Sequence, residues 1–112
     1  MTISTHVLDA VAGSPAAGVP VELARRAAAG WTALATGTTD ADGRIASFAG
    51  NHGATNHGVA GVYRLTFEIE GHVAGETFYP QVVIVFRVTD PGGHYHVPLL
   101  LSPYAYSTYR GS

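Results

Sequence analysis

Three histidines of this 112-residue sequence have a type and spacing suited to a functional site. His94 and His96 are two residues apart, and side chains two apart on a β-strand lie on one face of the sheet. His6 lies in the middle of another strand-like stretch, "STHVLDA", where Ser4 shares its face. A strand holds a polar side chain more rigidly than a loop does, which suits either metal binding or proton transfer.

The other histidines have less distinctive settings. His52 and His57 lie in the Gly- and Asn-rich stretch "NHGATNHG", and His72 lies at an expected turn. We expect these three side chains to be solvated, because polar residues commonly line loops. Arg44 directly follows the pair Asp42-Gly43, a position typical of an ordinary arginine at the end of a strand.

Metal binding is the weaker of the two chemistries. His94 and His96 together with His6 resemble a three-nitrogen zinc site, but neither an HExxH motif nor cysteine spacing supports one. The stretch "DADGR" does not fit a calcium loop, because Gly43 is fourth from Asp40 and not sixth, and the twelfth position is Asn51. We expect no metal.

The elements that position these residues are β-strands. Tyr63, Leu65 and Phe67 alternate with polar residues, which is the pattern of a half-buried strand. Similar patterns predict strands over residues 4–10, 19–27, 31–39, 44–48, 62–70, 81–88 and 97–101. The pair Asp42-Gly43 predicts a type I′ hairpin that joins residues 31–39 to 44–48, and "GHVAGETF" predicts a single helical turn. We expect an all-β sandwich of seven to eight strands with at most one short helix.

Length and composition limit the classes of function. A chain of 112 residues is expected to form a single domain over residues 1–112. A net charge of −2 without a basic cluster disfavours nucleic acid, and the apolar runs are too short for a membrane span. The chain has no cysteine, and its first ten residues lack the features of a secretory signal, so we expect a cytoplasmic protein.

The strands at 81–88 and 97–101 are apolar on both faces. Charged residues make up only 12% of the chain, against roughly 25% in ordinary soluble domains. A lone antiparallel sheet normally keeps one wet face, so we expect a second subunit to cover these strands.

The last nineteen residues, "HYHVPLLLSPYAYSTYRGS", are unusually rich in functional side chains for a terminus. Such ends are normally short, polar and loosely held. Tyr104, Tyr106 and Tyr109 are costly to expose, which favours a tail that packs.

Several segments together resemble the 5-hydroxyisourate hydrolase family, whose members are also called transthyretin-related proteins. In order along nearly the whole chain they are "STHVLDA", "GSPAAGVPVEL", "TTDADGR", "FYPQVVIVF" and "HYHVPLLLSPYAYSTYRGS". The terminal "YRGS" is the most specific, since transthyretin itself, a hormone carrier, shares the fold without that ending or the site histidines. The chain departs from the family pattern at Gln81 and Gly93, where acidic residues are common.

The resemblance implies a transthyretin-like β-sandwich that assembles as a homotetramer, a dimer of dimers, with active sites at the interface between dimers. It implies a cyclic amidohydrolase of urate degradation, in which water opens the six-membered ring of 5-hydroxyisourate to give 2-oxo-4-hydroxy-4-carboxy-5-ureidoimidazoline. No cofactor and no metal are expected.

The resemblance also assigns site residues. It implies catalytic roles for His6, Arg44, His96 and Ser112, and substrate contacts for His6, Arg44, Tyr109, Arg110 and Gly111. On this reading the two imidazoles activate or position the water, Arg44 stabilises the oxyanion, and Ser112 orients the water or relays a proton.

Three alternatives stay open at this point. Ser112 can act instead as a nucleophile, although activation needs a well-fixed base. The protein can instead be a transthyretin-like carrier that binds a small aromatic ligand in the central channel of the tetramer, and such a carrier needs no such tail. A non-catalytic adhesion or interaction domain predicts no organised cluster of histidine and arginine.

Overall fold

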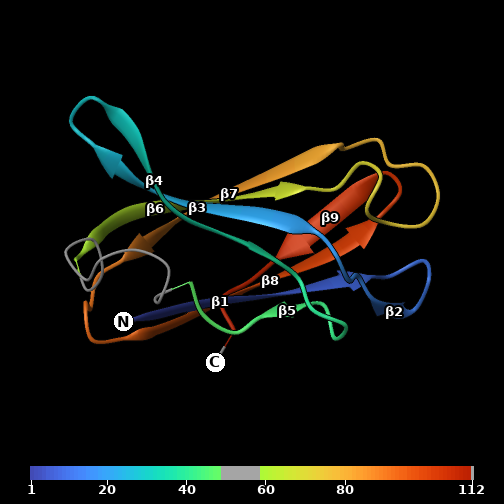
Figure 1. The fold of residues 1–112 in the computed structure, drawn as a ribbon, viewed down its shortest axis with the longest axis horizontal. Helices are drawn as coiled ribbons and strands as arrows, with labels where there is room; N and C mark the ends of the chain where they lie inside the picture. The colour runs from blue at the N-terminus through green and yellow to red at the C-terminus, as the bar shows by residue number, and fades with distance from the viewer. Residues whose placement is uncertain (49–58, 112) are drawn as a thin grey trace.

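The computed structural model describes residues 1–48 and 59–111 and shows two β-sheets packed face to face (Figure 1). Within these ranges there are nine strands: β1 (Thr2–Asp9), β2 (Ser14–Pro15), β3 (Pro20–Ala27), β4 (Gly30–Thr38), β5 (Arg44–Ile45), β6 (Gly61–Glu68), β7 (Gln81–Val88), β8 (His94–Ser102) and β9 (Ala105–Thr108). The expected all-β sandwich is confirmed.

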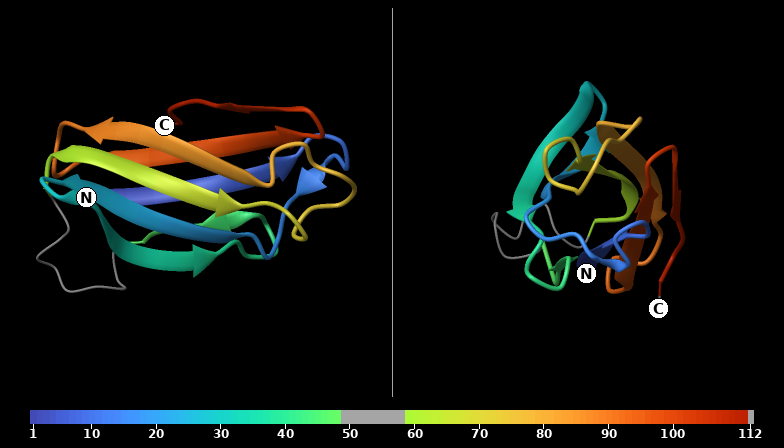
Figure 2. Two further views of the ribbon diagram at one scale, coloured as in Figure 1. Left: turned by 90° about the horizontal axis from the view of Figure 1, so that it is seen from above. Right: turned by 90° about the vertical axis from the view of Figure 1, so that its right-hand side faces the viewer.

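The strands divide into two layers, seen from two further sides in Figure 2. One sheet has the order β2-β1-β8-β9, and β5 pairs with β1 outside that path. The other sheet has the order β4-β3-β6-β7. All the pairings are antiparallel except that of β1 with β8, which is parallel and runs from Thr2 opposite His94 to Asp9 opposite Leu101. Because β1 and β8 come from opposite ends of the chain, this pairing unites the first and last strands that carry histidines.

The core lies between the sheets and follows the period-two pattern of the sequence. Tyr63, Leu65 and Phe67 of β6 are fully buried, as the alternation predicts, whereas Thr66 is half-buried and Glu68 is exposed. Val7 of β1 and other fully buried side chains meet them from the opposite sheet. Each such side chain contributes about 1.5–3 kcal/mol of hydrophobic stabilisation.

The predicted type I′ hairpin at Asp42-Gly43 is wrong. Strand β4 pairs with β3, whereas β5 pairs with β1 in the other sheet, so the turn carries the chain between layers. Of the two residues Asp42 and Gly43, only Gly43 has a positive φ (74°), whereas a type I′ turn needs a positive φ at both central positions. Asp40 organises the turn instead, because its carboxylate Oδ1 accepts hydrogen bonds of 2.9 Å from the N–H groups of Asp42 and Arg44.

The segment "GHVAGETF" contains turns and bends, not the expected helical turn. The N–H of His72 donates to the carbonyl of Ile69 at 2.9 Å, which closes a tight turn directly after β6. Gly71 and Gly75 weaken any helix here, because glycine has a low helix propensity. Among the described residues, no helix is long and apolar enough to cross a membrane.

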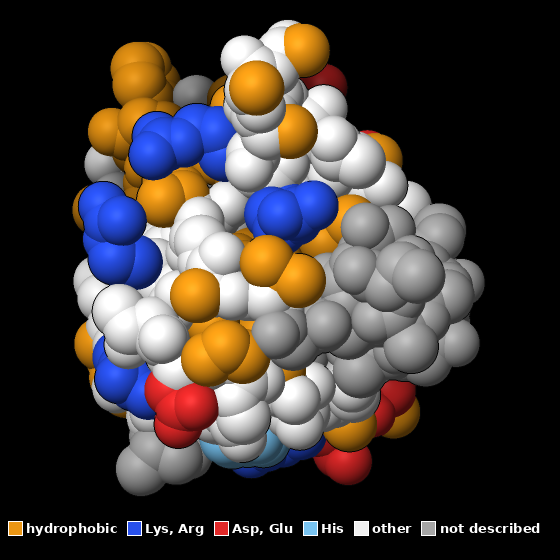
Figure 3. Space-filling model, turned by 90° about the vertical axis from the view of Figure 1, so that its left-hand side faces the viewer, with side chains coloured by type: hydrophobic (Ala, Val, Ile, Leu, Met, Phe, Trp, Pro, Cys, Tyr) orange, Lys and Arg blue, Asp and Glu red, His pale blue; other side chains and the backbone are white. Residues whose placement is uncertain are grey.

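A single chain leaves several apolar side chains in contact with solvent. On β7, Val83 and Val85 are 44% and 54% exposed, while Val82, Ile84 and Val88 on the other face are buried. Figure 3 shows arginine side chains standing among exposed hydrophobic ones at one end of the sandwich. The expectation that a second subunit covers β7 remains a prediction.

The close approach of Gly43 to β1 gives a test of the turn. Its N–H donates to Asp40 O, its carbonyl accepts from Val7 N–H at 2.7 Å, and a Cβ at this position would collide with the carbonyl oxygen of Val7. We expect Gly43→Ala to lower the free energy of unfolding by about 2–4 kcal/mol, because a collision adds to the cost of a positive φ.

Urea denaturation measures this loss. Gly13→Ala is the control, since Gly13 also has a positive φ (68°) but a Cβ there meets no atom within 4 Å. Its loss should stay at about 1–2 kcal/mol. Equal losses in the two variants would show that the contact with Val7 contributes nothing.

Candidate active site

The registers of β1 with two neighbouring strands bring the predicted histidines and arginine together. Ser4 lies opposite His96 in the parallel pairing with β8, and His6 lies opposite Arg44 in the antiparallel pairing with β5. Ile3 and Val7 of β1 are buried in the core, so Ser4 and His6 lie on the outer face of the sheet. Residues directly opposite one another share a face, which places His96 and Arg44 on this face as well.

His96 is held by a side chain of the neighbouring strand. Ser4 Oγ lies 2.8 Å from His96 Nδ1, and Ser4 is itself buried, with 7% of its surface exposed. The contact engages Nδ1, so Nε2 is the ring nitrogen available to a substrate or a water molecule.

The surroundings of His96 favour its neutral form. Burial is the largest cause that lowers the pKa of His96, because removal from water penalises the charged imidazolium. The positive charge of Arg44 lowers this pKa further, followed by smaller effects of His6 and His94. An imidazole that is neutral at pH 7 can accept or donate a proton through its nitrogens.

His6 is oriented by the turn that precedes β5. Its Nε2 lies 2.8 Å from the carbonyl oxygen of Asp42. A carbonyl oxygen only accepts, so Nε2 carries the proton and donates it. The only nitrogen of a neutral His6 that can take up a proton is therefore Nδ1.

A pocket of about 280 Å³ lies beside these side chains. Its walls come from β1, β8, β5 and the residue after β5: Ser4, Thr5, Arg44, Ile45, Ala46, His94 and His96. The alternation that predicted His94 and His96 on one face is confirmed, and His94 borders the same pocket. The volume is near the lower end of small-molecule sites, roughly 300 Å³.

The C-terminal segment returns along β8 to His96. The N–H of Gly111 donates to the carbonyl of His96 at 2.8 Å, and the two residues form an isolated antiparallel bridge. A Cβ on Gly111 would lie 2.5 Å from Cδ2 of the His96 ring. The tail therefore packs against the ring so closely that only glycine fits without displacement.

The other predicted tail residues are less closely joined to this cluster. The guanidinium of Arg110 lies over the ring of Tyr95, 4.7 Å from its centroid, in a cation–π contact. Tyr109 is 60% exposed and borders an apolar pocket between β7 and the tail. Ser112 lies outside the described residues, as do His52 and His57. The roles of Ser112, Tyr109 and Arg110 remain predictions.

The sequence did not indicate two partners in the site. Alternation placed Ser4 on the face of His6, but its contact with His96 depends on a register between strands that are 92 residues apart. The carbonyl of Asp42 is a backbone group, which residue types alone do not reveal. Within residues 1–48 and 59–111, no three His, Cys, Asp or Glu side chains gather in a way that could hold a metal ion.

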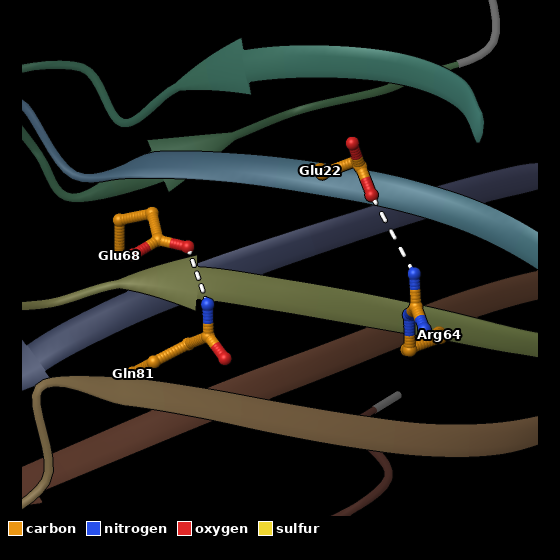
Figure 4. A network of polar contacts seen from close by, with 4 residues as sticks. All are labelled: Glu22, Arg64, Glu68 and Gln81. Carbon is orange, nitrogen blue, oxygen red and sulfur yellow. Dashed lines mark hydrogen bonds and ion pairs between the residues drawn. The ribbon is translucent and has the colours of Figure 1, made fainter.

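A larger hollow of about 810 Å³ lies on the outer face of the other sheet, between β4 and β7. Four of its polar side chains contact one another in pairs, as Figure 4 shows. Arg64 Nη2 lies 3.6 Å from Glu22 Oε1, and Gln81 Nε2 donates to Glu68 Oε1 at 2.7 Å. The smaller pocket is the better candidate because, of the two, only this pocket is lined by His94, His96 and Arg44, whose charge lowers the pKa of His96.

The pKa of His96 can be measured directly. In a ring-proton NMR titration we expect it below the ordinary value of about 6.5. Arg44→Ala should raise this pKa, because a neighbouring positive charge is removed. The pKa should still lie below the ordinary value, because burial is the larger cause. Arg26→Ala, on the other sheet, is the matched control and should leave it unchanged. A His96 pKa at or above the ordinary value would contradict the burial.

Comparisons with known proteins extend over nearly the whole chain. A sequence model of the HIUase/Transthyretin family matches residues 3–111. The 5-hydroxyisourate hydrolase of Caulobacter vibrioides is 46% identical, over 98% of this chain and 97% of that protein. The enzyme of the same name from Salmonella dublin is 43% identical, over 98% of this chain and 80% of that protein.

Solved structures agree with the sequence matches. The 5-hydroxyisourate hydrolase of Klebsiella pneumoniae has a TM-score of 0.81 and 39% identity, with all of both chains covered. Sea bream transthyretin in complex with thyroxine has a TM-score of 0.83 and 34% identity, over 99% of this chain and 95% of that one. By its sequence, its two-sheet fold and its full-length matches, this chain belongs to the HIUase/Transthyretin family.

Proposed function

We propose that this protein is a 5-hydroxyisourate hydrolase of urate degradation. The observation that carries the proposal is the cluster formed where β1 meets β5 and β8: His6 opposite Arg44, and His96 held by Ser4. Full-length relatives named for this activity are 40–46% identical to the chain. Water would open the six-membered ring of the substrate to give 2-oxo-4-hydroxy-4-carboxy-5-ureidoimidazoline.

The chemistry needs a proton acceptor for the attacking water and a positive field at the attacked carbonyl. His6 and His96 activate or position the water, and the lowered pKa of His96 favours its neutral ring at pH 7. Arg44 is permanently charged and lies on the same face, where it stabilises the negative charge that develops on the carbonyl oxygen. No cofactor or metal takes part in this proposal.

The tail completes the site in the same proposal. Gly111 already packs against the His96 ring, which brings the tail to the imidazole. Tyr109, Arg110 and Gly111 would contact the substrate. Ser112 would orient the water or relay a proton.

Assembly and location are further parts of the proposal. A homotetramer, built as a dimer of dimers, would cover the exposed Val83 and Val85 of β7. One domain over residues 1–112 and a cytoplasmic location are proposed with it, and a chain without cysteine suits a reducing compartment. We propose neither a nucleic-acid partner nor a membrane partner.

A small-ligand carrier is the second candidate, because sea bream transthyretin, which was solved with thyroxine, is as similar in structure as the hydrolase. The backbone therefore does not distinguish the two functions. The side chains do, since a carrier needs neither paired imidazoles nor a tail that is fitted to one of them.

Removing an imidazole or the cation tests the hydrolase proposal. We expect His96→Asn and Arg44→Ala to reduce turnover by about 10²–10⁴-fold, the range for loss of an acid–base group or of an oxyanion partner. The measurement is the ultraviolet decay of freshly generated 5-hydroxyisourate, corrected for its spontaneous decay. His72→Asn, in the turn after β6, is the control and should keep wild-type turnover. Wild-type decay rates in either site variant would refute the assignment.

The fit of the tail gives a separate test. Gly111→Ala puts a methyl group against the His96 ring, so we expect at least about a tenfold loss of kcat/KM. Removal of residues 109–112 should abolish hydrolysis. Gly92→Ala is the control, because its Cβ would approach no atom closer than 3.5 Å.

Sedimentation of the truncated protein separates catalysis from structure. An unchanged assembly with no activity supports a catalytic tail. Dissociation of the assembly would instead make the tail a structural element.

A further inference from the structure

We propose that Ser4 is a positioning residue that fixes the neutral His96 ring as its Nε2–H tautomer, which makes His96 a hydrogen-bond donor to the oxyanion and His6 the proton acceptor of the site. The assignment of the tautomer stands on geometry alone. The division of roles between the two histidines rests on the proposed hydrolase function.

The first observation is the rigid placement of Ser4. It lies in the middle of β1, which pairs on one side with β8 and on the other with β5, and only 7% of its surface is exposed. Its Oγ is 2.8 Å from Nδ1 of His96, the residue opposite it in the parallel register. Both partners are on strands, so the contact does not depend on a loop.

Which of Ser4 Oγ and His96 Nδ1 donates this hydrogen bond follows from the partners that Ser4 Oγ has. A serine hydroxyl has one proton to donate and two lone pairs that can accept. In the part of the chain that the structure describes, His96 Nδ1 is the only hydrogen-bond partner of Ser4 Oγ. If Nδ1–H donated to Ser4, the hydroxyl proton of Ser4 would have no acceptor among the described residues, and an unpaired donor on a buried residue is costly. The hydroxyl therefore donates to Nδ1.

A consequence for His96 follows directly. A neutral imidazole has one N–H and one bare nitrogen, so acceptance at Nδ1 puts the proton on Nε2. The ring is kept neutral by burial and by the charge of Arg44 beside it. Nε2–H can then only donate a hydrogen bond to a group that the ring contacts.

His6 has the complementary arrangement. Its Nε2–H donates to the carbonyl of Asp42, so the bare nitrogen of neutral His6 is Nδ1. The two imidazoles thus differ in what they offer: His6 accepts a proton and His96 donates a hydrogen bond. A reaction that takes a proton from water and builds negative charge on a carbonyl oxygen needs one of each.

The proposed step balances as follows. The water oxygen forms a bond to the ring carbonyl carbon while one water proton passes to Nδ1 of His6. Nε2–H of His96 and the guanidinium of Arg44 stabilise the oxyanion that forms. When the C–N bond of the substrate ring breaks, the proton on His6 passes to the departing nitrogen, which restores neutral His6.

The test reads the tautomer itself, by ¹⁵N NMR of histidine-labelled full-length protein at about pH 8, where imidazole is neutral. We expect a pyrrole-type shift for Nε2 of His96 and a pyridine-type shift for Nδ1. Ser4→Ala should replace this pattern by shifts averaged between tautomers, and Ser4→Thr should keep it, because threonine retains the hydroxyl. A pyrrole-type Nδ1 in the wild type, or an unchanged pattern in Ser4→Ala, would overturn the proposal.

Thr5→Val is the matched control for loss of a buried hydroxyl. Thr5 Oγ1 donates to the carbonyl of Val97 at 2.6 Å across the same two strands, but it does not touch His96. This variant should be destabilised in thermal unfolding yet leave the His96 shifts unchanged. A tautomer change in Thr5→Val as large as that in Ser4→Ala would show a general effect of strand disturbance and overturn the role of Ser4.

Kinetics separate this inference from the proposed function. We expect Ser4→Ala to lower kcat/KM for 5-hydroxyisourate by about 5- to 10-fold, the effect of one lost hydrogen bond, and Ser4→Thr to restore most of it. If the His96 ¹⁵N shifts are as expected but the protein does not accelerate the decay of 5-hydroxyisourate, the tautomer is supported and the hydrolase function is refuted. If the His96 ¹⁵N shifts change as expected in Ser4→Ala but this variant keeps full activity, the assigned donor role of His96 is overturned.

Discussion

The parallel pairing of β1 with β8 is the constraint on which the rest of the site depends. It sets the first strand beside the last long one in a fixed register, so that Ser4 is opposite His96. A shift of one residue would turn the whole histidine-bearing face of one strand into the core. The core side chains Ile3, Val7 and Leu99, all buried, resist such a shift and so hold the site in register indirectly.

Strand β1 is also where the site's second half is assembled. The turn organised by Asp40 leads the chain out of the β4 sheet and lays β5 against β1, which brings Arg44 opposite His6. The same turn presents the carbonyl of Asp42 to His6. One local feature, a carboxylate that accepts hydrogen bonds from the backbone amides of Asp42 and Arg44, therefore places both the cation and the carbonyl that orients an imidazole.

Sequence patterns predict the elements of this protein better than their pairing. Alternation alone identifies the buried face of β6 and puts His94 and His96 together, because these depend on neighbours within one strand. The Asp42-Gly43 pair does not form the predicted hairpin, because its turn is held by hydrogen bonds to Asp40 and because the strands on either side of it pair with other strands. Likewise, the partnership of Ser4 with His96 needs a register that spans 92 residues, which no local pattern contains.

The site also shows how one sandwich can serve more than one function. The backbone resembles sea bream transthyretin as closely as it resembles the Klebsiella hydrolase, with TM-scores of 0.83 and 0.81. The proposed site is carried on one outer face: polar groups on β1 and β8, and a tail whose Gly111 lies directly on the His96 ring. A larger residue at position 111 would separate tail and ring without disturbing any strand of the core. The proposed site therefore depends on a few contacts at the surface, while the buried side chains between the sheets stabilise the fold beneath it.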